Sequence, residues 1–482
     1  MTRGHDALRR IIAVVLVLAA SGCVYLAFRD DSAPAAAGQT RRLATPLWSP
    51  RRVPQPVVDA VGAQRLQSQI DAEAGTGQTC VVVNAGAGDI ASRNPSVPMT
   101  PASTQKLLTS LAALSTMGPD FKYETKAVAA SEPGNGTVER LWLVGAGDPL
   151  LSTPDYPGMV ESNPQRFREE QATGPSKSTT SLATLADAIV AAGVRNIPGG
   201  VQGDDSRYEA LRYLPSWSPT YRTDPEVGPV GALTVNHGIG TVQPNLTPVD
   251  DPAVYAATQL SDLLRARGVS VGAPGRSTAP NGAKTIGSVQ SASLHDIVAA
   301  AIESSDNLAM EMLAREVGLR AANQGTTAAG AKAIVDKVHA VGVPVDGVAL
   351  VDGSGLDYGN RVTCKTLMSV LAMGARPEFK ALWDGLAVAG QTGTLADEFG
   401  GSPLTGKLHG KTGSLDGVTG LAGFVDTGRL VVFSYIANGG FGQGGGIAMR
   451  ARIAGIVGRF PDAPPADQLV PLPGTPAARA RP

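Results

Sequence analysis

Cysteine, histidine and aromatic residues, which often reveal a function, are scarce in this chain. Its 482 residues include three cysteines and five histidines, and aromatic residues make up 5% of the total. No CxxC motif and no pair of histidines at helical spacing occurs. The sequence therefore predicts no built-in zinc site and no cofactor.

An excess of charge of either sign is also absent. The chain has 41 Lys and Arg residues against 42 Asp and Glu residues, a net charge of −1. Nucleic-acid binding requires a basic surface, so this balance argues against it. With 43% hydrophobic and 17% charged residues, the chain has enough apolar material for a large core and too little charge for a disordered protein.

An uncharged stretch of eighteen residues, Ile11–Phe28, lies near the N-terminus and follows three arginines, Arg3, Arg9 and Arg10. This pattern predicts an export signal or membrane anchor in residues 1–30, with the N-terminus in the cytoplasm. A signal-anchor is our first interpretation, while a cleaved signal peptide and lipidation at Cys23 stay open. We expect the remainder of the chain to be extracytoplasmic, in the periplasm or cell wall.

Two cysteines, Cys80 and Cys364, lie outside the predicted anchor. An oxidising compartment permits a disulfide between them. The sequence does not decide between this disulfide and two separate buried thiols, because it does not show how close the two Cα atoms come.

The chain divides by composition and predicted secondary structure into five regions. We predict an anchor or signal in 1–30, a linker in 31–56, a catalytic domain from 57–122 and 286–462, an inserted region in 123–285 with short strands and many turns, and a disordered tail in 463–482. Helices are expected at 57–74, from Pro101 to Gly118, at 294–321, at 326–341 and from Ala448, and strands at 79–83, 141–144, 421–425 and 430–436.

Three short motifs follow one another along the chain. They are Ser103-Thr104-Gln105-Lys106, Ser305-Asp306-Asn307 and Lys411-Thr412-Gly413. Chance can supply each of them in a chain of this length. In this order and in matching local structure, the set is typical of class A β-lactamases and penicillin-binding proteins.

Ser103 and Lys106 have the spacing of a nucleophile and its base. Ser103 lies at the predicted start of a helix, where free N–H groups favour a developing anion. Lys106 follows three residues later on the same helix face. An ordinary lysine with a pKa of ~10.4 is almost fully protonated at pH 7, so Lys106 needs burial or a second cation, which Lys411 could supply, to act as a base.

The other two motifs have chemistry suited to a substrate. Ser305 and Asn307 are predicted between helical runs at 294–304 and 308–318, in a loop that presents a hydroxyl and an amide to a cleft. Lys411 and Thr412 are predicted in an edge strand beside that cleft. A cation and a hydroxyl suit a substrate carboxylate.

Over roughly residues 57–460, the chain resembles the penicillin-binding DD-peptidases of the low-molecular-mass, DacB-like class, serine peptidase family S13. The spacing agrees, since Ser305 follows Ser103 by 202 positions, too many for a compact β-lactamase. Besides the three motifs, the segments that carry the resemblance are Pro101–Leu107, Leu143–Pro149, Leu233–Asn236, Asp352–Leu356 and His409–Leu415. We assign no role to Asp352–Leu356 beyond a tight turn.

The resemblance implies an α/β (α+β) fold, a serine β-lactamase/DD-peptidase-like domain interrupted by a large inserted region. It also implies an acyl-enzyme mechanism on D-Ala-D-Ala peptides and acylation by penicillins. Ser103 would attack with Lys106 as base, and Ser305 would relay a proton to the leaving amine. The backbone N–H groups of Ser103 and Ser414 would form the oxyanion hole. Asn307 would hold the substrate amide, and Lys411 with Thr412 would bind the terminal carboxylate.

We therefore expect a membrane-tethered serine D-Ala-D-Ala carboxypeptidase acting on peptidoglycan stem peptides, with endopeptidase activity on cross-links left open. One alternative is a serine β-lactamase, although no E-x-x-L-N segment supplies a deacylating carboxylate. Another is a catalytically idle penicillin-binding scaffold of the cell wall. The segment Gly86–Ala91 matches G-x-G-x-x-A, but Pro95 prevents the long helix that a dinucleotide site requires.

Overall fold

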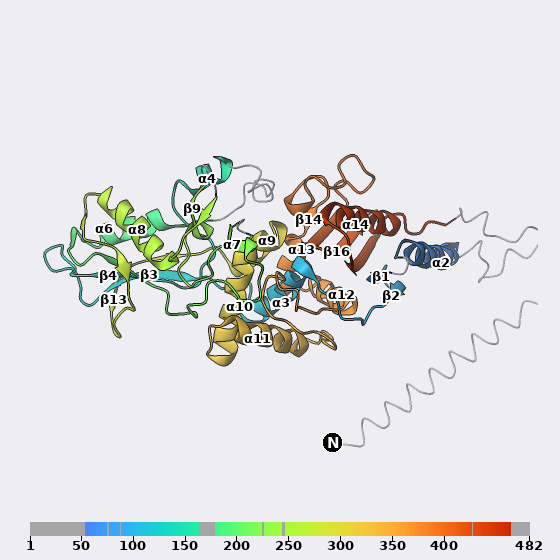
Figure 1. Ribbon diagram of the computed structural model, residues 1–482, viewed down its shortest axis with the longest axis horizontal. Coiled ribbons are helices and arrows are strands. Elements are labelled where there is room, and N and C mark those ends of the chain that lie inside the picture. The colour runs from blue at the N-terminus through green and yellow to red at the C-terminus, as the bar shows by residue number, and fades with distance from the viewer. Residues whose placement is uncertain are drawn as a thin grey trace, which may run out of the picture. The chain divides into compact units, whose positions relative to one another are not determined.

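The computed structural model describes residues 54–74, 77–86, 88–162, 179–223, 226–242, 246–426 and 428–463 (Figure 1). The predicted anchor, Cys23, nearly all of the predicted linker and nearly all of the predicted tail lie outside these residues. Within the part of the chain that is described, no helix is both long and apolar enough to span a bilayer.

A six-stranded antiparallel sheet is the framework of the part of the fold that carries the three motifs. Its strands are arranged in the order β14-β15-β16-β17-β1-β2. Their bounds are β1 Gln78–Asn84, β2 Asp89–Arg93, β14 Ala387–Val388, β15 Leu408–Leu415, β16 Val418–Asp426 and β17 Leu430–Asn438. The strands predicted at 79–83, 421–425 and 430–436 are confirmed, and β2 shows that Gly86–Ala91 leads into a strand and not into a helix.

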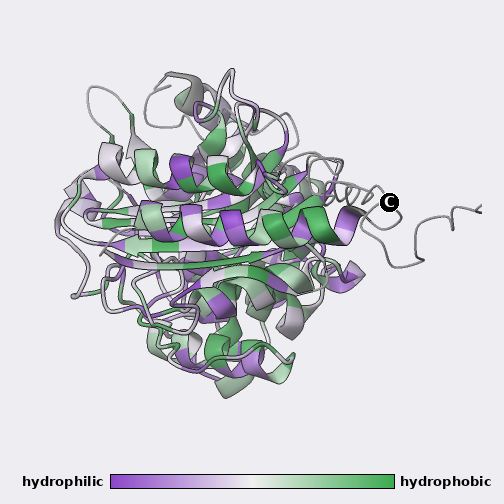
Figure 2. Cartoon of the chain, turned by 90° about the vertical axis from the view of Figure 1, so that its right-hand side faces the viewer, coloured by the Kyte–Doolittle hydropathy of each residue, from purple (hydrophilic) through white to green (hydrophobic). Residues whose placement is uncertain are grey.

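Both faces of this sheet are buried. Successive side chains of a strand point to opposite sides, so each strand contributes to two cores. In β1, Cys80 and Val82 belong to one core, whereas Val81 and Val83 belong to another. Figure 2 shows strands with helices on either side of them. The first core is closed by helices α3 Lys106–Met117, α9 Leu294–Glu303, α10 Asn307–Ala322, α11 Thr327–Ala340, α12 Cys364–Met373 and α13 Ala381–Asp384, and the second by α2 Pro54–Ala74 and α14 Gln443–Val457.

The break predicted between the helical runs at 294–304 and 308–318 is present at Ser304–Asp306, where Ser305 has a φ of 59°. Two details of this part differ from the sequence-based expectation. Asn307 is the first residue of α10 and not part of the loop. The strand β15 is covered at one end, since the two-residue strand β14 pairs with its Gly410 and His409. Lys411 and Thr412 pair with β16 alone among the described strands, so they lie at the sheet edge, as predicted.

A second, mixed sheet of five strands lies in the segment 124–290. Its order is β12-β8-β4-β3-β13, and two helices, α6 Leu182–Ala191 and α8 Pro252–Arg265, pack against it. The bounds of these strands are β3 Glu124–Ala129, β4 Leu141–Val144, β8 Val201–Asp204, β12 Gly275–Arg276 and β13 Lys284–Gln290. Because β13 continues to Gln290, it crosses the predicted boundary at 285, and the division into domains stays a prediction.

Shorter elements complete the described part of the fold. The short strands are β5 Leu151–Ser152, β6 Thr180–Ser181, β7 Asn196–Ile197, β9 Ile239–Thr241, β10 Thr247–Pro248 and β11 Ser270–Val271. The short helices are α4 Tyr156–Ser162, α7 Thr220–Thr223 and the 3₁₀ helices η1 Ala102–Gln105, η2 Asn236–Gly238, η3 Pro377–Phe379 and η4 Gly393–Leu395.

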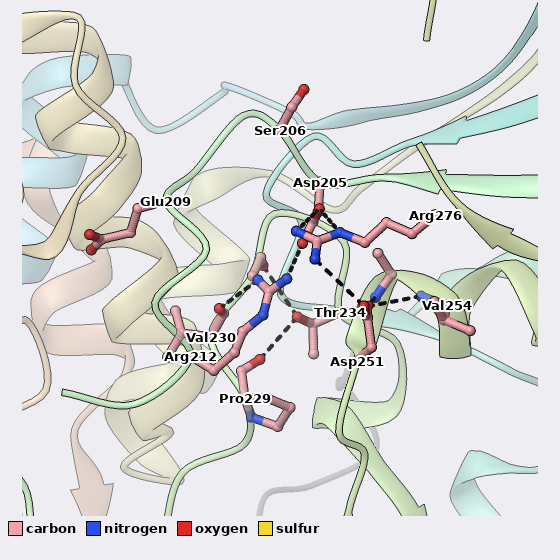
Figure 3. A network of polar contacts seen from close by, with 12 residues as sticks. Asp205, Ser206, Glu209, Arg212, Pro229, Val230, Thr234, Asp251, Val254 and Arg276 are labelled. Atoms are coloured by element: carbon pink, nitrogen blue, oxygen red, sulfur yellow. Dashed lines mark hydrogen bonds and ion pairs between the residues drawn. The ribbon is translucent and has the colours of Figure 1, made fainter. Parts of the chain in front are cut away.

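A partly buried ion network holds the segment 205–234 against α8 and β12 (Figure 3). Asp205 accepts hydrogen bonds from Arg212 and from Arg276, whose Nε lies 3.0 Å from Asp205 Oδ1. Arg276 also pairs with Asp251, the residue that caps α8. Arg212 in addition donates to the carbonyl of Val230 at 3.1 Å. These contacts fix the chain on either side of Trp217, which reaches the site described below.

A disulfide joins Cys80 in β1 to Cys364, the first residue of α12, with a Cα–Cα distance of 5.9 Å. The sequence left this pairing open, and the structure shows the paired state. The bond ties the central sheet to the helical layer of the first core across 284 positions of sequence.

Candidate active site

The three predicted motifs meet at one cleft of about 950 Å³. Its lining includes Ser103, Ser305, Asn307, Thr412 and Ser414. These residues come from η1, the break between α9 and α10, the start of α10, and β15. The fold thus gathers residues that lie up to about three hundred positions apart in the sequence.

Ser103 lies on a tight turn packed between two glycine-containing segments. The preceding residue, Ala102, is fully buried with a φ of 47°. A Cβ atom on Gly355 would lie 2.1 Å from the carbonyl oxygen of Ala102, and one on Gly413 would lie 2.8 Å from that of Pro101. Only glycine permits these approaches. The helix expected from Pro101 begins as η1 and becomes α-helical at Lys106.

The ammonium group of Lys106 is fully buried and has three partners. Its Nζ lies 2.8 Å from Ser103 Oγ, 2.6 Å from Asn307 Oδ1 and 2.8 Å from the carbonyl oxygen of Ser354. The amide of Asn307 is oriented by its other end, because Nδ2 donates to the carbonyl of Glu226 at 2.6 Å. Asn307 therefore presents its oxygen to Lys106.

This arrangement directs the lone pair of a neutral Lys106 toward Ser103. A neutral amine has two hydrogens and one lone pair. The oxygens of Asn307 and Ser354 can only accept, so they take the two hydrogens. The lone pair is left facing the Ser103 hydroxyl, which is the geometry that a general base requires.

Burial lowers the pKa of Lys106 from 10.5 to about 8, although the charges of Asp352 and Glu311 oppose the change. Of the two conditions that the sequence left open, burial or a second cation, burial is the leading cause. At pH 7 a lysine with this pKa is neutral in roughly one molecule in ten, so a reactive fraction exists.

Two buried acids organise the segment that faces Lys106. Glu311 Oε1 accepts the backbone N–H groups of Gly353 and Ser354 at 3.0 and 2.7 Å. Burial and the Asp352 charge raise the pKa of Glu311 to about 8. Asp352 accepts from donors that include the indole of Trp217 at 2.9 Å and the N–H of Gly355 at 2.9 Å. The segment Asp352–Leu356 thus holds an acceptor for Lys106.

Asp306, the middle residue of the second motif, is held by the 123–285 segment. Its Oδ1 caps α10 by accepting the N–H of Ala309 at 2.9 Å, and its Oδ2 lies 3.1 Å from His237 Nε2. The other ring nitrogen of His237 lies 2.7 Å from the Tyr156 hydroxyl. These contacts fix the break that presents Ser305 to the cleft.

The strand β15 presents alternate residues to the cleft. Thr412 and Ser414 line the cleft, and Thr412 Oγ1 lies 2.8 Å from Thr394 Oγ1. Lys411 is fully buried, and its Nζ donates to the carbonyl of Thr412 at 3.0 Å. Lys411 is not among the residues that line the cleft. The predicted carboxylate ligands and the oxyanion hole of Ser103 and Ser414 stay predictions about roles.

Sequence reasoning missed Glu311, Trp217 and the contact of His237 with Asp306. Glu311 follows Asn307 by four residues on the same helix, so its position on the same face was a usable signal. Trp217 and His237 gave no signal, because their contacts are with distant parts of the chain. Within the described ranges, no cluster of three or more His, Cys, Asp or Glu side chains is arranged to hold a metal ion.

Comparison with known proteins agrees with this geometry. The model of the D-Ala-D-Ala carboxypeptidase 3 (S13) family matches residues 63–248 and 241–459. The chain belongs to this family. The predicted family is therefore confirmed, and the chain is a serine-type peptidase, as predicted.

Individual relatives extend over most of the chain. The D-alanyl-D-alanine carboxypeptidase of Actinomadura sp. is 28% identical over 80% of this chain and 83% of its own. Carboxypeptidase DacB of Mycolicibacterium smegmatis is 31% identical over 71% of this chain and 72% of its own. The crystal structure of penicillin binding protein 4 (dacB) from Haemophilus influenzae has a TM-score of 0.66 at 21% identity and covers 82% of this chain and 99% of its own. This likeness confirms the predicted fold class.

Proposed function

We propose that this S13-family peptidase is a serine D-Ala-D-Ala carboxypeptidase that removes the terminal D-alanine from peptidoglycan stem peptides and is acylated by penicillins at Ser103. The observation that carries the proposal is the placement of Lys106, whose lone pair faces Ser103 Oγ at 2.8 Å. Two relatives that match this chain over most of their length are named as carboxypeptidases, and these names support the substrate class.

In the first half of the reaction, Ser103 Oγ bonds to the carbonyl carbon between the two D-alanines, and its proton moves to Lys106 Nζ. The C–N bond breaks, and the leaving amine takes a proton from Lys106, with Ser305 as the proposed relay. The oxyanion formed on the way is assigned to the backbone N–H groups of Ser103 and Ser414. Free D-alanine and a Ser103 ester result.

In the second half, water attacks the ester carbonyl and gives its proton to the neutral Lys106. The Ser103–acyl bond then breaks, and the proton returns to Ser103 Oγ. Asn307 keeps its oxygen on Lys106 throughout. The position on Nζ that gains and loses a proton therefore stays directed toward Ser103. Penicillin follows the first half, because its lactam carbonyl takes the place of the peptide carbonyl.

We also propose that the enzyme acts outside the cytoplasm, tethered by residues 1–30. The uncharged stretch Ile11–Phe28 with its basic flank supports this location. The Cys80–Cys364 disulfide supports it independently, because such bonds persist in oxidising compartments. Fractionation of cells expressing the full chain tests it: recovery with the cytoplasm would overturn it.

The activity is tested on the full chain in detergent with labelled penicillin and with a peptide ending in D-Ala-D-Ala. We expect label on Ser103 and release of D-alanine, and loss of both in Ser103→Ala and Lys106→Met. Ser369→Ala, a change of a partly exposed serine on α12, is the matched control.

Other outcomes identify the alternatives. Absence of label on Ser103 would overturn the assignment. Rapid release of hydrolysed penicillin would favour a β-lactamase, and label without release of D-alanine would favour an idle penicillin-binding scaffold.

A further inference from the structure

Arg450, a residue of α14, is almost fully buried and is one of the residues that line the cleft. Its Nε and Nη2 donate to the two carboxylate oxygens of Glu398, with Nε 3.1 Å from Oε2. Its Nη1 donates to Ser414 Oγ at 2.7 Å and lies 3.4 Å from the carbonyl oxygen of Gly413. The bidentate contact with Glu398 fixes the plane of the guanidinium, and thereby the direction of the bond to Ser414.

The bond from Arg450 decides what the Ser414 hydroxyl can do. A guanidinium has only donors, so Ser414 Oγ must be the acceptor. The hydrogen of Ser414 is therefore available to a different acceptor. Ser414 lines the cleft together with Ser103 and Thr412. A hydroxyl that already accepts from a cation is a stronger donor, since hydrogen bonds in a chain polarise one another.

We propose that Arg450 is a positioning residue that, through Ser414, gives the cleft its preference for substrates ending in a free carboxylate. The inference rests on the proposed function and deepens it. The Ser414 hydroxyl donates to a carboxylate oxygen of the terminal D-alanine beside Thr412. In this proposal Arg450 acts on the substrate through Ser414 and not by direct contact, because its guanidinium is already paired with Glu398.

The experiment compares one N-acylated peptide ending in D-Ala-D-Ala as the free acid and as the C-terminal carboxamide. The measured quantity is the ratio of kcat/KM for the acid to kcat/KM for the amide. The test variant is Arg450→Met with Glu398→Met, which removes the pair together and leaves no unpaired buried charge. The matched control is Arg452→Met with Glu73→Met, a more exposed pair that also starts from α14.

We expect the ratio to fall about tenfold in the test variant and to stay unchanged in the control, because a charge-assisted hydrogen bond is lost. In a Ser414→Ala background, the same double replacement should change the ratio by less than about twofold, since Arg450 acts through Ser414. A ratio unchanged in the test variant would overturn the inference. So would an equal tenfold fall in the Ser414→Ala background. Circular dichroism of each variant establishes that it is folded.

A second readout separates this inference from the proposed function. Acylation of Ser103 by a penicillin and by its methyl ester gives the same acid preference without turnover. If the wild type neither releases D-alanine nor is acylated, the proposed function fails and the inference with it. If the wild type reacts and both preferences persist in the test variant, only the inference fails.

Discussion

Glu311 and Lys106 are linked through a single residue, Ser354. The Ser354 N–H donates to Glu311 Oε1 at 2.7 Å, and the Ser354 carbonyl accepts from Lys106 Nζ at 2.8 Å. A buried acid thus sets the position of an acceptor for the buried base. Because their charges interact as well, the two groups are expected to titrate together.

The rate of acylation of Ser103 by penicillin should rise with pH up to about 8 and then level off. Burial lowers the pKa of Lys106 to about 8, and only the neutral amine can accept the Ser103 proton. Below that pH the neutral fraction, and with it the second-order rate constant, should increase nearly tenfold per pH unit. Stopped-flow measurements from pH 5.5 to 9.5 give this rate constant for acylation by penicillin. A rate that is flat between pH 6 and 8 would contradict the assignment of Lys106 as the base.

The substitution Glu311→Gln should move this rise to lower pH. The charge of Glu311, which develops as pH rises through its pKa of about 8, raises the pKa of Lys106. Removing that charge lowers the pKa of Lys106 and leaves more neutral amine near pH 8. Glutamine keeps an oxygen for the N–H groups of Gly353 and Ser354. The midpoint of the pH profile of the acylation rate measures this shift. A midpoint at higher pH than in the wild type would contradict the prediction.

Two further variants complete that experiment. Glu311→Ala removes the acceptor together with the charge, so it should also lower the plateau rate, because two buried N–H groups lose their partner. Asp336→Asn, which removes an exposed acid on α11, should leave the profile unchanged.

The motifs allowed the participants of the site to be predicted, because each motif is local. Ser103 and Lys106 are one turn apart, and Thr412 and Ser414 alternate on one strand, so their side chains share a surface in any structure with those elements. The order and spacing of the motifs added the fold class. These residues alone carry the resemblance to the family.

The residues that hold the site residues in place could not be predicted in the same way. Trp217 reaches Asp352 across 135 positions, and Arg450 reaches Ser414 across 36 positions from a different element. Such contacts depend on how helices and sheets pack, and no periodicity in the sequence encodes that packing. The strand β14, which covers only the His409–Gly410 end of β15, was missed because it is two residues long and carries no strand pattern.

Asp352→Asn should destabilise the fold far more than Trp217→Phe. Asp352 Oδ1 accepts from Gly355 and Asn360, and Oδ2 accepts from Trp217 and Asp357. An asparagine has a single acceptor oxygen, so about two buried donors would lose their partner. We expect a loss of about 2–4 kcal/mol in the free energy of unfolding, against about 1 kcal/mol for the loss of the Trp217 hydrogen bond alone.

Urea unfolding followed by circular dichroism measures both changes. Asp346→Asn, an exposed aspartate in the loop before this segment, is the control and should lie within about 0.5 kcal/mol of the wild type. Equal effects of Asp352→Asn and Asp346→Asn would mean that the hydrogen bonds of Asp352 do not hold the segment.

Removal of the Cys80–Cys364 disulfide should lower the free energy of unfolding by about 2–5 kcal/mol, because the bond restricts a long loop of the unfolded chain. The variant is Cys80→Ala with Cys364→Ala, and both sites are fully buried, so small apolar residues are tolerated. The wild type treated with a reducing agent in urea should approach the same midpoint. Cys23→Ala leaves the pair intact and should keep both the wild-type midpoint and its sensitivity to the reducing agent. If the reducing agent leaves the wild-type midpoint where it is, the bond does not stabilise the fold, and the support that it gives to an extracytoplasmic location is lost as well.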